Sequence, residues 1–405
     1  MAQIKLYLHK KDGSIIEYIA AEIDSITLSL YDVPGNPENP EVPPVVPSDS
    51  VVVEKISFDS LTTGMYYQMW YVDRDSYWGL QELTSDEIVV PTRFLGDWRD
   101  GYMYLHLHNH DFEVASRRTN NTWMFLVEGI NMCDRLIGKI NNDEVEDCTE
   151  ENLAELYIYR SWYQYLMLDS FGDIQYNGKE LSRTEAFDSI ITDLLTYVPK
   201  ASIEKDYGRV NRSVGWMILS KMYLNAEAWN VAGIANFAKS AQDCYRISAA
   251  FADSIIIKGG YSLESDYFTN FKVDNQISKE NIWNILCEES YGDGLEFHNL
   301  THHYALKDKY GMKEQPWNGY CTTHKVIGIY EAGDRRIETW ARGQQYDKED
   351  SVIKISVGID ESAYMKMPIY VRKPNSWPYN LEAFKLMNAG LYSINFDFPV
   401  YYTDT

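Results

Sequence analysis

The spacing of apolar residues predicts a helical array between about residues 120 and 250. Apolar side chains recur every three or four positions in successive segments, which is the pattern of helices that bury one face. Thr149 can cap the second of these helices, and Ser182 opens a capping box before the third. The helices are expected over 123–140, 156–166, 187–198, 213–229 and 235–247. Their starts do not repeat at a fixed interval, so the spacing alone does not establish a tetratricopeptide solenoid.

The first residues follow a different pattern. Residues 3–31 alternate between apolar and polar positions in three short stretches, which predicts a small β-module. Residues 34–47 then contain six prolines, a composition typical of an extended linker. We therefore expect a β-module at 1–33, a proline-rich linker at 34–50 and a helical scaffold at 51–250.

The last part of the chain, 251–405, has a mixed pattern rich in loops. Residues 281–289 and 351–359 are predicted to be strands, because each is a short run of apolar and β-branched residues. The stretches between them hold glycine, asparagine and tryptophan and predict loops. The whole chain is therefore expected to be mostly α, with a mixed α/β part toward its end.

Charge narrows the range of partners. The 405 residues contain 37 Lys and Arg against 60 Asp and Glu, a net charge of −23. Binding to nucleic acids and to anionic membranes needs a basic surface, so this balance argues against both as partners. Five cysteines without a CxxC pair favour buried free thiols over a disulfide or zinc framework. The 11 Trp and 32 Tyr include enough aromatic side chains to line a binding face as well as a core.

Three histidines in "GYMYLHLHNHDF" raise the question of a metal site. His106, His108 and His110 would share one face if this stretch were a strand, and three imidazoles can hold zinc. A second histidine group, His298, His302 and His303 in "HNLTHH", lacks the glutamate of an HExxH motif. We therefore interpret these histidines as ordinary hydrogen-bonded residues and expect no zinc site. A structural calcium ion bound by the acidic loops remains an alternative.

No sequence motif predicts catalysis. The stretch from Asp73 resembles a calcium loop at only two positions, because Trp78 stands where the turn glycine is required. GxSxG, P-loop and GxGxxG motifs do not occur. A glycosidase needs two carboxyl groups at a set separation. Pairs of acidic residues are frequent in this sequence, but an acidic chain produces such pairs by chance. An acidic glycoside hydrolase and a helical protein–protein scaffold remain the alternatives to a binding protein.

One stretch is more specific than any of these patterns. "GLQELTSDEIVVPTRFLGDWRDG", residues 79–101, resembles the "LQE(L/A)(T/S)SDE…VPTR…DW.DGG" segment of the SusD/RagB family, the surface glycan-binding lipoproteins of Bacteroidota. Four later segments resemble further family motifs in the same order: "NNTWMFLVEGINMCDRLI", "ELYIYRSWYQYLMLDSFGDIQY", "GRVNRSVGWMILSKMYLNAEAW" and "YFTNFKVDNQISKENIWNI". "WNGY", with "VIGIYEAGDRRI" after it, adds one more, so the resemblance covers roughly 60–340.

The resemblance implies a scaffold of tetratricopeptide-like helix pairs that carries a loop-rich ligand face. It also implies a role without catalysis or cofactors: capturing oligo- or polysaccharides at the outer-membrane surface and delivering them to a SusC-like TonB-dependent transporter. The chain departs from the family in three respects. It has no signal peptide or lipobox cysteine, its opening segment is the β-module, and it stops at "FDFPVYYTDT", where the family continues with further helices. We therefore expect a truncated C-terminus.

A sugar ring has an apolar C–H face and an edge of hydroxyls, so a binding site needs an aromatic platform beside donors and acceptors. Two loops have that mixture, "TRFLGDWRDG" and "PWNGY". The predicted ligand-binding residues are Arg93, Asp97, Trp98, Asp100, Trp317, Asn318 and Tyr320. The alternative for Trp98 and Trp317 is that each merely anchors its loop on the helices.

Overall fold

The computed structural model forms two compact units, Met1–Val52 and Val53–Thr405. It describes residues 5–9, 15–19, 55–72, 76–85, 87–92, 98–113, 116–176, 179–272, 274–287, 295–341, 345–355, 392–393 and 400–403. The predicted domain boundaries at 33, 50 and 250 remain predictions, because the linker lies outside these residues.

The described part of the first unit is a β-hairpin. Strands β1 (Lys5–His9) and β2 (Ile15–Ile19) pair in antiparallel fashion, with Lys5 opposite Ile19. This agrees with the first two predicted strands. The third predicted strand falls outside the described residues.

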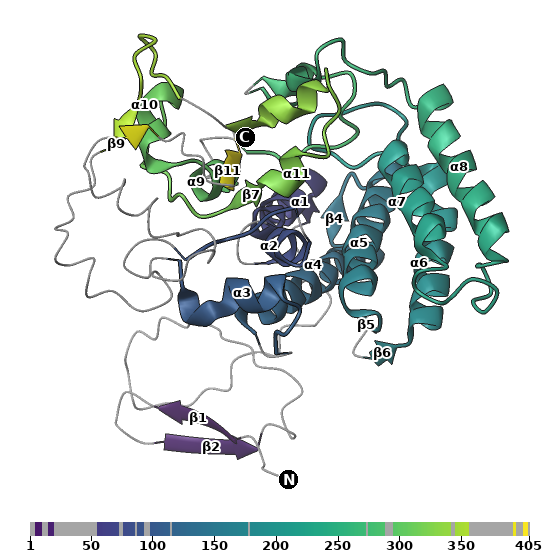
Figure 1. Ribbon diagram of the computed structural model, residues 1–405. Helices are drawn as coiled ribbons and strands as arrows, with labels where there is room; N and C mark the ends of the chain where they lie inside the picture. Colours follow the sequence, from purple (N-terminus) through teal and green to yellow (C-terminus); the bar gives the residue numbers. More distant parts are fainter. Residues whose placement is uncertain are drawn as a thin grey trace. The chain divides into compact units, whose positions relative to one another are not determined.

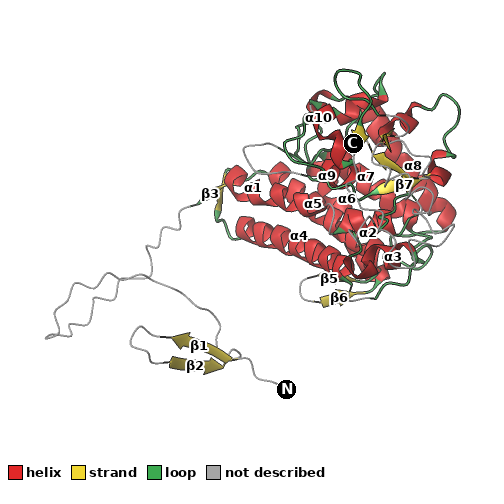
Figure 2. Cartoon of the chain, turned by 60° about the vertical axis from the view of Figure 1, so that its left-hand side comes forward, coloured by secondary structure: helices red, strands yellow, loops and turns green. Residues whose placement is uncertain are grey.

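Helices make up most of the described part of the second unit (Figure 2). Five long helices follow one another, and the contacts run from α4 to α5, from α5 to α6 and from α7 to α8 (Figure 1). The helices are α1 (Phe58–Gln68), α2 (Tyr77–Leu83), α3 (Met103–His108), α4 (Arg117–Asn141), α5 (Glu150–Phe171), α6 (Arg183–Tyr197), α7 (Arg212–Asn225), α8 (Ala241–Lys258), α9 (Phe297–Thr301), α10 (Lys307–Tyr310) and α11 (His324–Ile327). Within the described ranges no helix is both long and apolar enough to cross a membrane. The mostly helical prediction is confirmed.

The strands of this unit are short and join its loops. The largest sheet has the order β7–β11–β8. The strands are β3 (Ile56–Ser57) with β4 (Val145–Glu146), β5 (Ile174–Tyr176) with β6 (Lys179–Leu181), β9 (Lys354–Ile355) with β10 (Tyr392–Ser393), and β7 (Cys321–Thr323) and β8 (Trp340–Ala341) with β11 (Val400–Thr403). Because these pairings are so small, the helices provide the framework for the loops.

The ends of α5 and α6 follow from their capping residues. Thr149 forms a capping box with Asn152, and Ser182 forms the predicted box with Glu185. Gly172 ends α5 at a φ of 84°, a left-handed conformation that favours glycine. A Cβ at Gly172 would also lie 2.3 Å from Arg183 Nε. The sequence therefore sets both ends of α5 and the start of α6.

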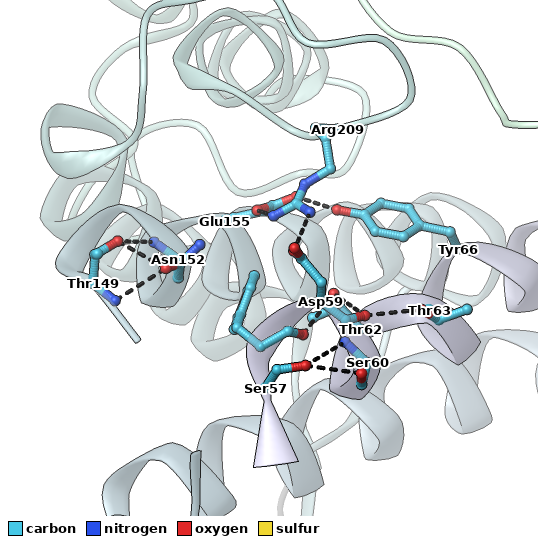
Figure 3. A network of polar contacts seen from close by, with 11 residues as sticks. Ser57, Asp59, Ser60, Thr62, Thr63, Tyr66, Thr149, Asn152, Glu155 and Arg209 are labelled. Atoms are coloured by element: carbon cyan, nitrogen blue, oxygen red, sulfur yellow. Dashed lines mark hydrogen bonds and ion pairs between the residues drawn. The ribbon is translucent and has the colours of Figure 1, made fainter. Parts of the chain in front are cut away.

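A buried ion pair ties α1 and α5 to the loop before α7 (Figure 3). Arg209 donates from Nε and Nη2 to the Glu155 carboxylate at 2.8 and 2.6 Å, and from Nη1 to Asp59 Oδ1 at 3.1 Å. The Tyr66 hydroxyl donates to the same Glu155 carboxylate. Burial, together with the charge of Glu155, raises the pKa of Tyr66 far above its usual value, so the phenol keeps its proton.

A second ion pair joins α4, α5 and α6. Arg160 of α5 donates to Asp134 Oδ1 at 2.6 Å and to Asp193 Oδ2 at 2.7 Å. Its guanidinium also lies 4.5 Å from the Tyr157 ring and 5.2 Å from the Tyr176 ring. One planar cation therefore holds three consecutive helices of the array together.

Four predicted elements differ from the structure. Residues 281–287 form no strand, because Trp283 inserts among the helices instead of lying in a ladder: its indole N–H donates to Gly208 O at 3.0 Å, and its ring packs on Tyr159 and Trp162. The fourth helix ends at Asn225 rather than 229, and the fifth begins at Ala241, after the cap Ser240. Of the strand predicted at 351–359, only Lys354–Ile355 is described as one.

Candidate functional site

The two loops predicted to bind a ligand meet in the structure. The Trp98 indole N–H donates to the carbonyl oxygen of Trp317 at 2.9 Å, across 219 positions of sequence. Gly319 allows this approach, since a Cβ at that position would lie 2.4 Å from Trp98 Cζ2. We call residues 98–102 the Trp98 loop and residues 317–320 the Trp317 loop.

Backbone hydrogen bonds hold the Trp317 loop against the C-terminal end of α9. The N–H of Trp317 donates to Asn299 O at 2.6 Å, that of Asn318 to His302 O at 2.9 Å and that of Tyr320 to Leu300 O at 2.9 Å. The next residue, Cys321, exchanges two backbone bonds with Val89. The loop is therefore supported along its whole length, as a preformed binding surface requires.

An aromatic layer lies beneath the Trp98 loop. The ring of Trp98 is 5.7 Å from that of Tyr104 and 6.1 Å from that of Tyr320. Tyr320 is fully buried and also packs on Trp78 at 5.2 Å. The structure therefore corrects the prediction that Tyr320 contacts a ligand, because its ring is enclosed by neighbouring rings and serves as support.

The backbone of both loops is strained. Trp98, Asp100 and Tyr102 have φ values of 58°, 38° and 66°, and Asn318 has 55°. L-residues seldom adopt this left-handed region, at a cost of order 1–3 kcal/mol each, and such residues cluster at ligand sites. Three of them in five positions of the Trp98 loop make this loop the strongest candidate for function.

The solvent-facing aromatic of the Trp98 loop is Tyr102, which the sequence analysis missed. Its side chain is 45% exposed, and the Arg99 guanidinium lies 5.8 Å from its ring centre. Trp98 itself is half-buried rather than exposed. The signal that could have found Tyr102 is its place directly after Gly101, where a turn projects the next side chain outward.

Asp100 is exposed and accepts a hydrogen bond from the Tyr104 hydroxyl through Oδ2 at 2.8 Å. Burial raises the pKa of Tyr104 to about 12, and the hydrogen bond to Asp100 adds to the rise. The Tyr104 phenol therefore keeps its proton and donates a hydrogen bond to Asp100, two positions before Tyr102.

The structure brings five of the seven predicted residues into the two joined loops: Trp98, Asp100, Trp317, Asn318 and Tyr320. Trp317 and Asn318 are half-buried, and Tyr320 is fully buried in the aromatic layer. Arg93 and Asp97 lie outside the described residues. The two loops thus combine aromatic rings with an exposed carboxylate, which is a mixture that suits a sugar.

The histidine stretch is a helix instead of a strand. His106 and His108 lie in α3 two positions apart and point to different sides, while His110 follows the helix. His106 bonds Asp111 Oδ1 at 3.0 Å, and His110 bonds Thr84 O at 2.6 Å. Among the described residues no three His, Cys, Asp or Glu side chains come close enough to hold a metal.

The chain is similar in fold to several solved structures. Surface glycan-binding protein A from Bacteroides uniformis matches with a TM-score of 0.58 and 12% identity, over 73% of this chain and 65% of that one. A SusD superfamily protein from Bacteroides fragilis matches with a TM-score of 0.55 and 13% identity, over 73% and 65%. The chain has the SusD-like fold. The predicted resemblance to this family is thereby confirmed at the level of the fold.

A further structure of similar fold was solved with a xylogluco-oligosaccharide, with a TM-score of 0.59 and 18% identity over 71% of this chain and 58% of that one. The chain thus spans less than two thirds of the length of these three structures. No family model and no curated protein sequence matches it.

Proposed function

We propose that this SusD-like chain binds oligo- or polysaccharides without cleaving them, at the face made by the Trp98 and Trp317 loops. The observation that carries the proposal is the strained Trp98 loop, tied to the Trp317 loop by a direct bond, in which an exposed tyrosine lies two positions from an exposed carboxylate. The C–H face of a sugar stacks on the Tyr102 ring, and its hydroxyls bond Asp100.

Binding without hydrolysis is the better proposal because of the carboxylates. A glycosidase places two carboxyl groups on either side of the scissile bond. In the described residues 98–102 and 317–320, Asp100 is the one carboxylate. The fold similarity to proteins described as surface glycan-binding supports the same choice.

We further propose a location at the outer-membrane surface and delivery of the glycan to a SusC-like TonB-dependent transporter. The support is the SusD-like fold together with the six ordered sequence motifs. Affinity capture from outer-membrane extracts with the purified chain tests this step. A transporter retained by the wild type, and by a Tyr102→Ala variant as well, is expected; no retained transporter would count against delivery.

The binding proposal is tested by titration calorimetry against a panel of oligosaccharides that includes xylogluco-oligosaccharides. We expect Tyr102→Ala and Trp98→Ala to weaken binding about tenfold each, since ring stacking adds roughly 0.5–1.5 kcal/mol to the area that it covers and 1.4 kcal/mol is one decade. Tyr245→Ala is the matched control, because Tyr245 is 39% exposed but lies on α8. Equal affinities in all four proteins would move the site elsewhere.

The same incubations test the absence of catalysis. Bound oligosaccharides should be recovered intact after hours at neutral pH. New reducing ends that increase in proportion to protein concentration would favour the hydrolase alternative.

A further inference from the structure

Arg118 is an arginine buried directly behind the candidate site. It is the second residue of α4 and is 1% exposed, which is rare for a charged side chain. Its guanidinium carbon lies 5.1 Å from the Tyr104 ring and 5.6 Å from the Tyr320 ring. These are the two rings on which Trp98 packs. Arg118 and Trp98 therefore share one pair of tyrosines.

A chain of contacts leads from Arg118 to the loop. The Arg118 guanidinium stacks on the Tyr104 ring, and its charge lowers the pKa of Tyr104 against the larger effect of burial. The Tyr104 hydroxyl in turn donates to Asp100 Oδ2 at 2.8 Å. The end of the chain is Asp100, at the middle of the strained segment.

A strained backbone persists only when its surroundings hold it in place. Asp100, Gly101 and Tyr102 all have positive φ, and their backbone bonds are local, from Tyr102 N–H to Arg99 O and from Met103 N–H to Asp100 O. The Tyr104 hydroxyl adds a side-chain bond to Asp100, and Arg118 holds the Tyr104 ring by stacking on it.

We propose that Arg118 is a positioning residue for the glycan face: acting through Tyr104, it fixes Asp100 and Tyr102 in the conformation that binds sugar. The glycan part of this proposal rests on the proposed function, whereas the conformational part stands independently. A guanidinium suits the role because it can stack on aromatic rings and donate hydrogen bonds at the same time. Lysine has the charge but lacks the planar donor group.

Hydrogen–deuterium exchange tests the conformational part without a ligand. Arg118→Met removes the charge and the donors but keeps an apolar stem, and Tyr104→Phe removes only the hydroxyl. We expect peptides covering 98–105 to exchange roughly tenfold faster in both variants, the size expected for a lost bond to a charged group. Peptides covering 156–166 of α5 should be unchanged.

Arg160→Met is the matched control, because Arg160 is 4% exposed and also stacks on two tyrosines, but in the helical array. It should speed exchange in α4–α6 and leave 98–105 unchanged. Arg118→Lys should recover part of the protection. Equal acceleration of all segments in Arg118→Met, or none at 98–105 in Tyr104→Phe, would overturn the positioning role and leave Arg118 a core residue.

A double-mutant cycle then connects the positioning role to binding, with the oligosaccharide that binds the wild type most tightly in the panel. Arg118→Met and Tyr104→Phe should each weaken binding about fivefold to tenfold, and the double variant should be no weaker than the worse single variant, because both act on one chain. If the losses of affinity in the two single variants multiplied in the double variant, Arg118 and Tyr104 would act independently, and the proposal would be contradicted. If no oligosaccharide binds the wild type, the proposed function fails, while the exchange experiment still decides the role of Arg118.

Discussion

The helical array and the proposed glycan face each contain a buried arginine stacked on two tyrosines, but the arginine has a different role in each. In the array, Arg160 stacks on Tyr157 and Tyr176 and bonds two carboxylates from the neighbouring helices. In the face, Arg118 stacks on Tyr104 and Tyr320, and its influence reaches the strained loop through a hydroxyl. The comparison teaches that a buried arginine stacked on two tyrosines joins helices in the array and, as proposed, orients a loop in the face.

The largest effect is expected in the array, at the Glu155–Arg209 pair. Glu155→Ala should lower the free energy of unfolding by about 3 kcal/mol, because removing one partner of a buried pair leaves the other charge uncompensated. It also removes the acceptor of Tyr66. Urea denaturation measures the change, and glycan affinity at a temperature where the variant is folded should equal that of the wild type.

Asp59→Asn is the control for this prediction. The Asp59 side chain is 87% exposed, so its bond to Arg209 is screened by water and its loss should change stability by less than about 1 kcal/mol. A Glu155 variant as stable as Asp59→Asn would show that the pair does not stabilise the array.

Substitution of two glycines, one in each region, should distinguish the array from the face more clearly. A Cβ at Gly129 would lie 2.3 Å from the Tyr163 ring in the array, and one at Gly319 would lie 2.4 Å from the Trp98 ring in the face. Gly129→Ala should cost about 1–3 kcal/mol of stability by overpacking, with unchanged affinity. Gly319→Ala should displace Trp98 and weaken glycan binding about tenfold, with a smaller loss of stability.

Thermal denaturation and calorimetry on both alanine variants check this pair. A loss of stability in Gly319→Ala that matches Gly129→Ala, with affinity retained, would show that the Trp98 loop is ordinary core.

The smallest effect concerns Glu82 on α2, a helix that packs against both α4 and α3. Burial, followed by the charge of Glu87, raises the pKa of Glu82 from 4.5 to about 7. Between these values the folded protein keeps a proton that the unfolded chain releases, so rising pH lowers the stability of the wild type. Above pH 7 the destabilisation is complete.

Glu82→Gln cannot ionise, so its melting temperature should exceed that of the wild type by on the order of 2 °C at pH 8 and by less at pH 5.5. Glu87→Gln should give a weaker change in the same direction, because it removes the second cause only. A difference that grows toward acid pH would reverse the sign and contradict the raised pKa.

The sequence predicted the array well because its signals are local. The apolar stripe of α4, the cap at Thr149 and the box at Ser182 each lie within a few residues of the structure that they specify. The error at 281–287 has the opposite origin. Trp283 has a strand-like neighbourhood in sequence, but its environment comes from Tyr159 and Trp162, over a hundred positions away.

The candidate site could be predicted only in part, because its loops have a local signal in the sequence and the contacts between them do not. Composition marked the loops around Trp98 and Trp317, but the sequence could not tell that Tyr320 is buried or that Tyr102 is exposed. Both depend on how the two loops meet. Arg118 carried no signal, since an arginine near the start of a helix gives no indication of which rings surround it.

The bond from Trp98 to Trp317 has a consequence for the order in which the protein is made. The first five long helices are complete by Lys258, while the Trp317 loop is still to be synthesised. Closing a contact across 219 positions has a high entropic cost until the intervening helices have compacted the chain. The face made by the two loops is thus assembled after its scaffold, and ligand binding there, as proposed, would mark a chain that has finished folding.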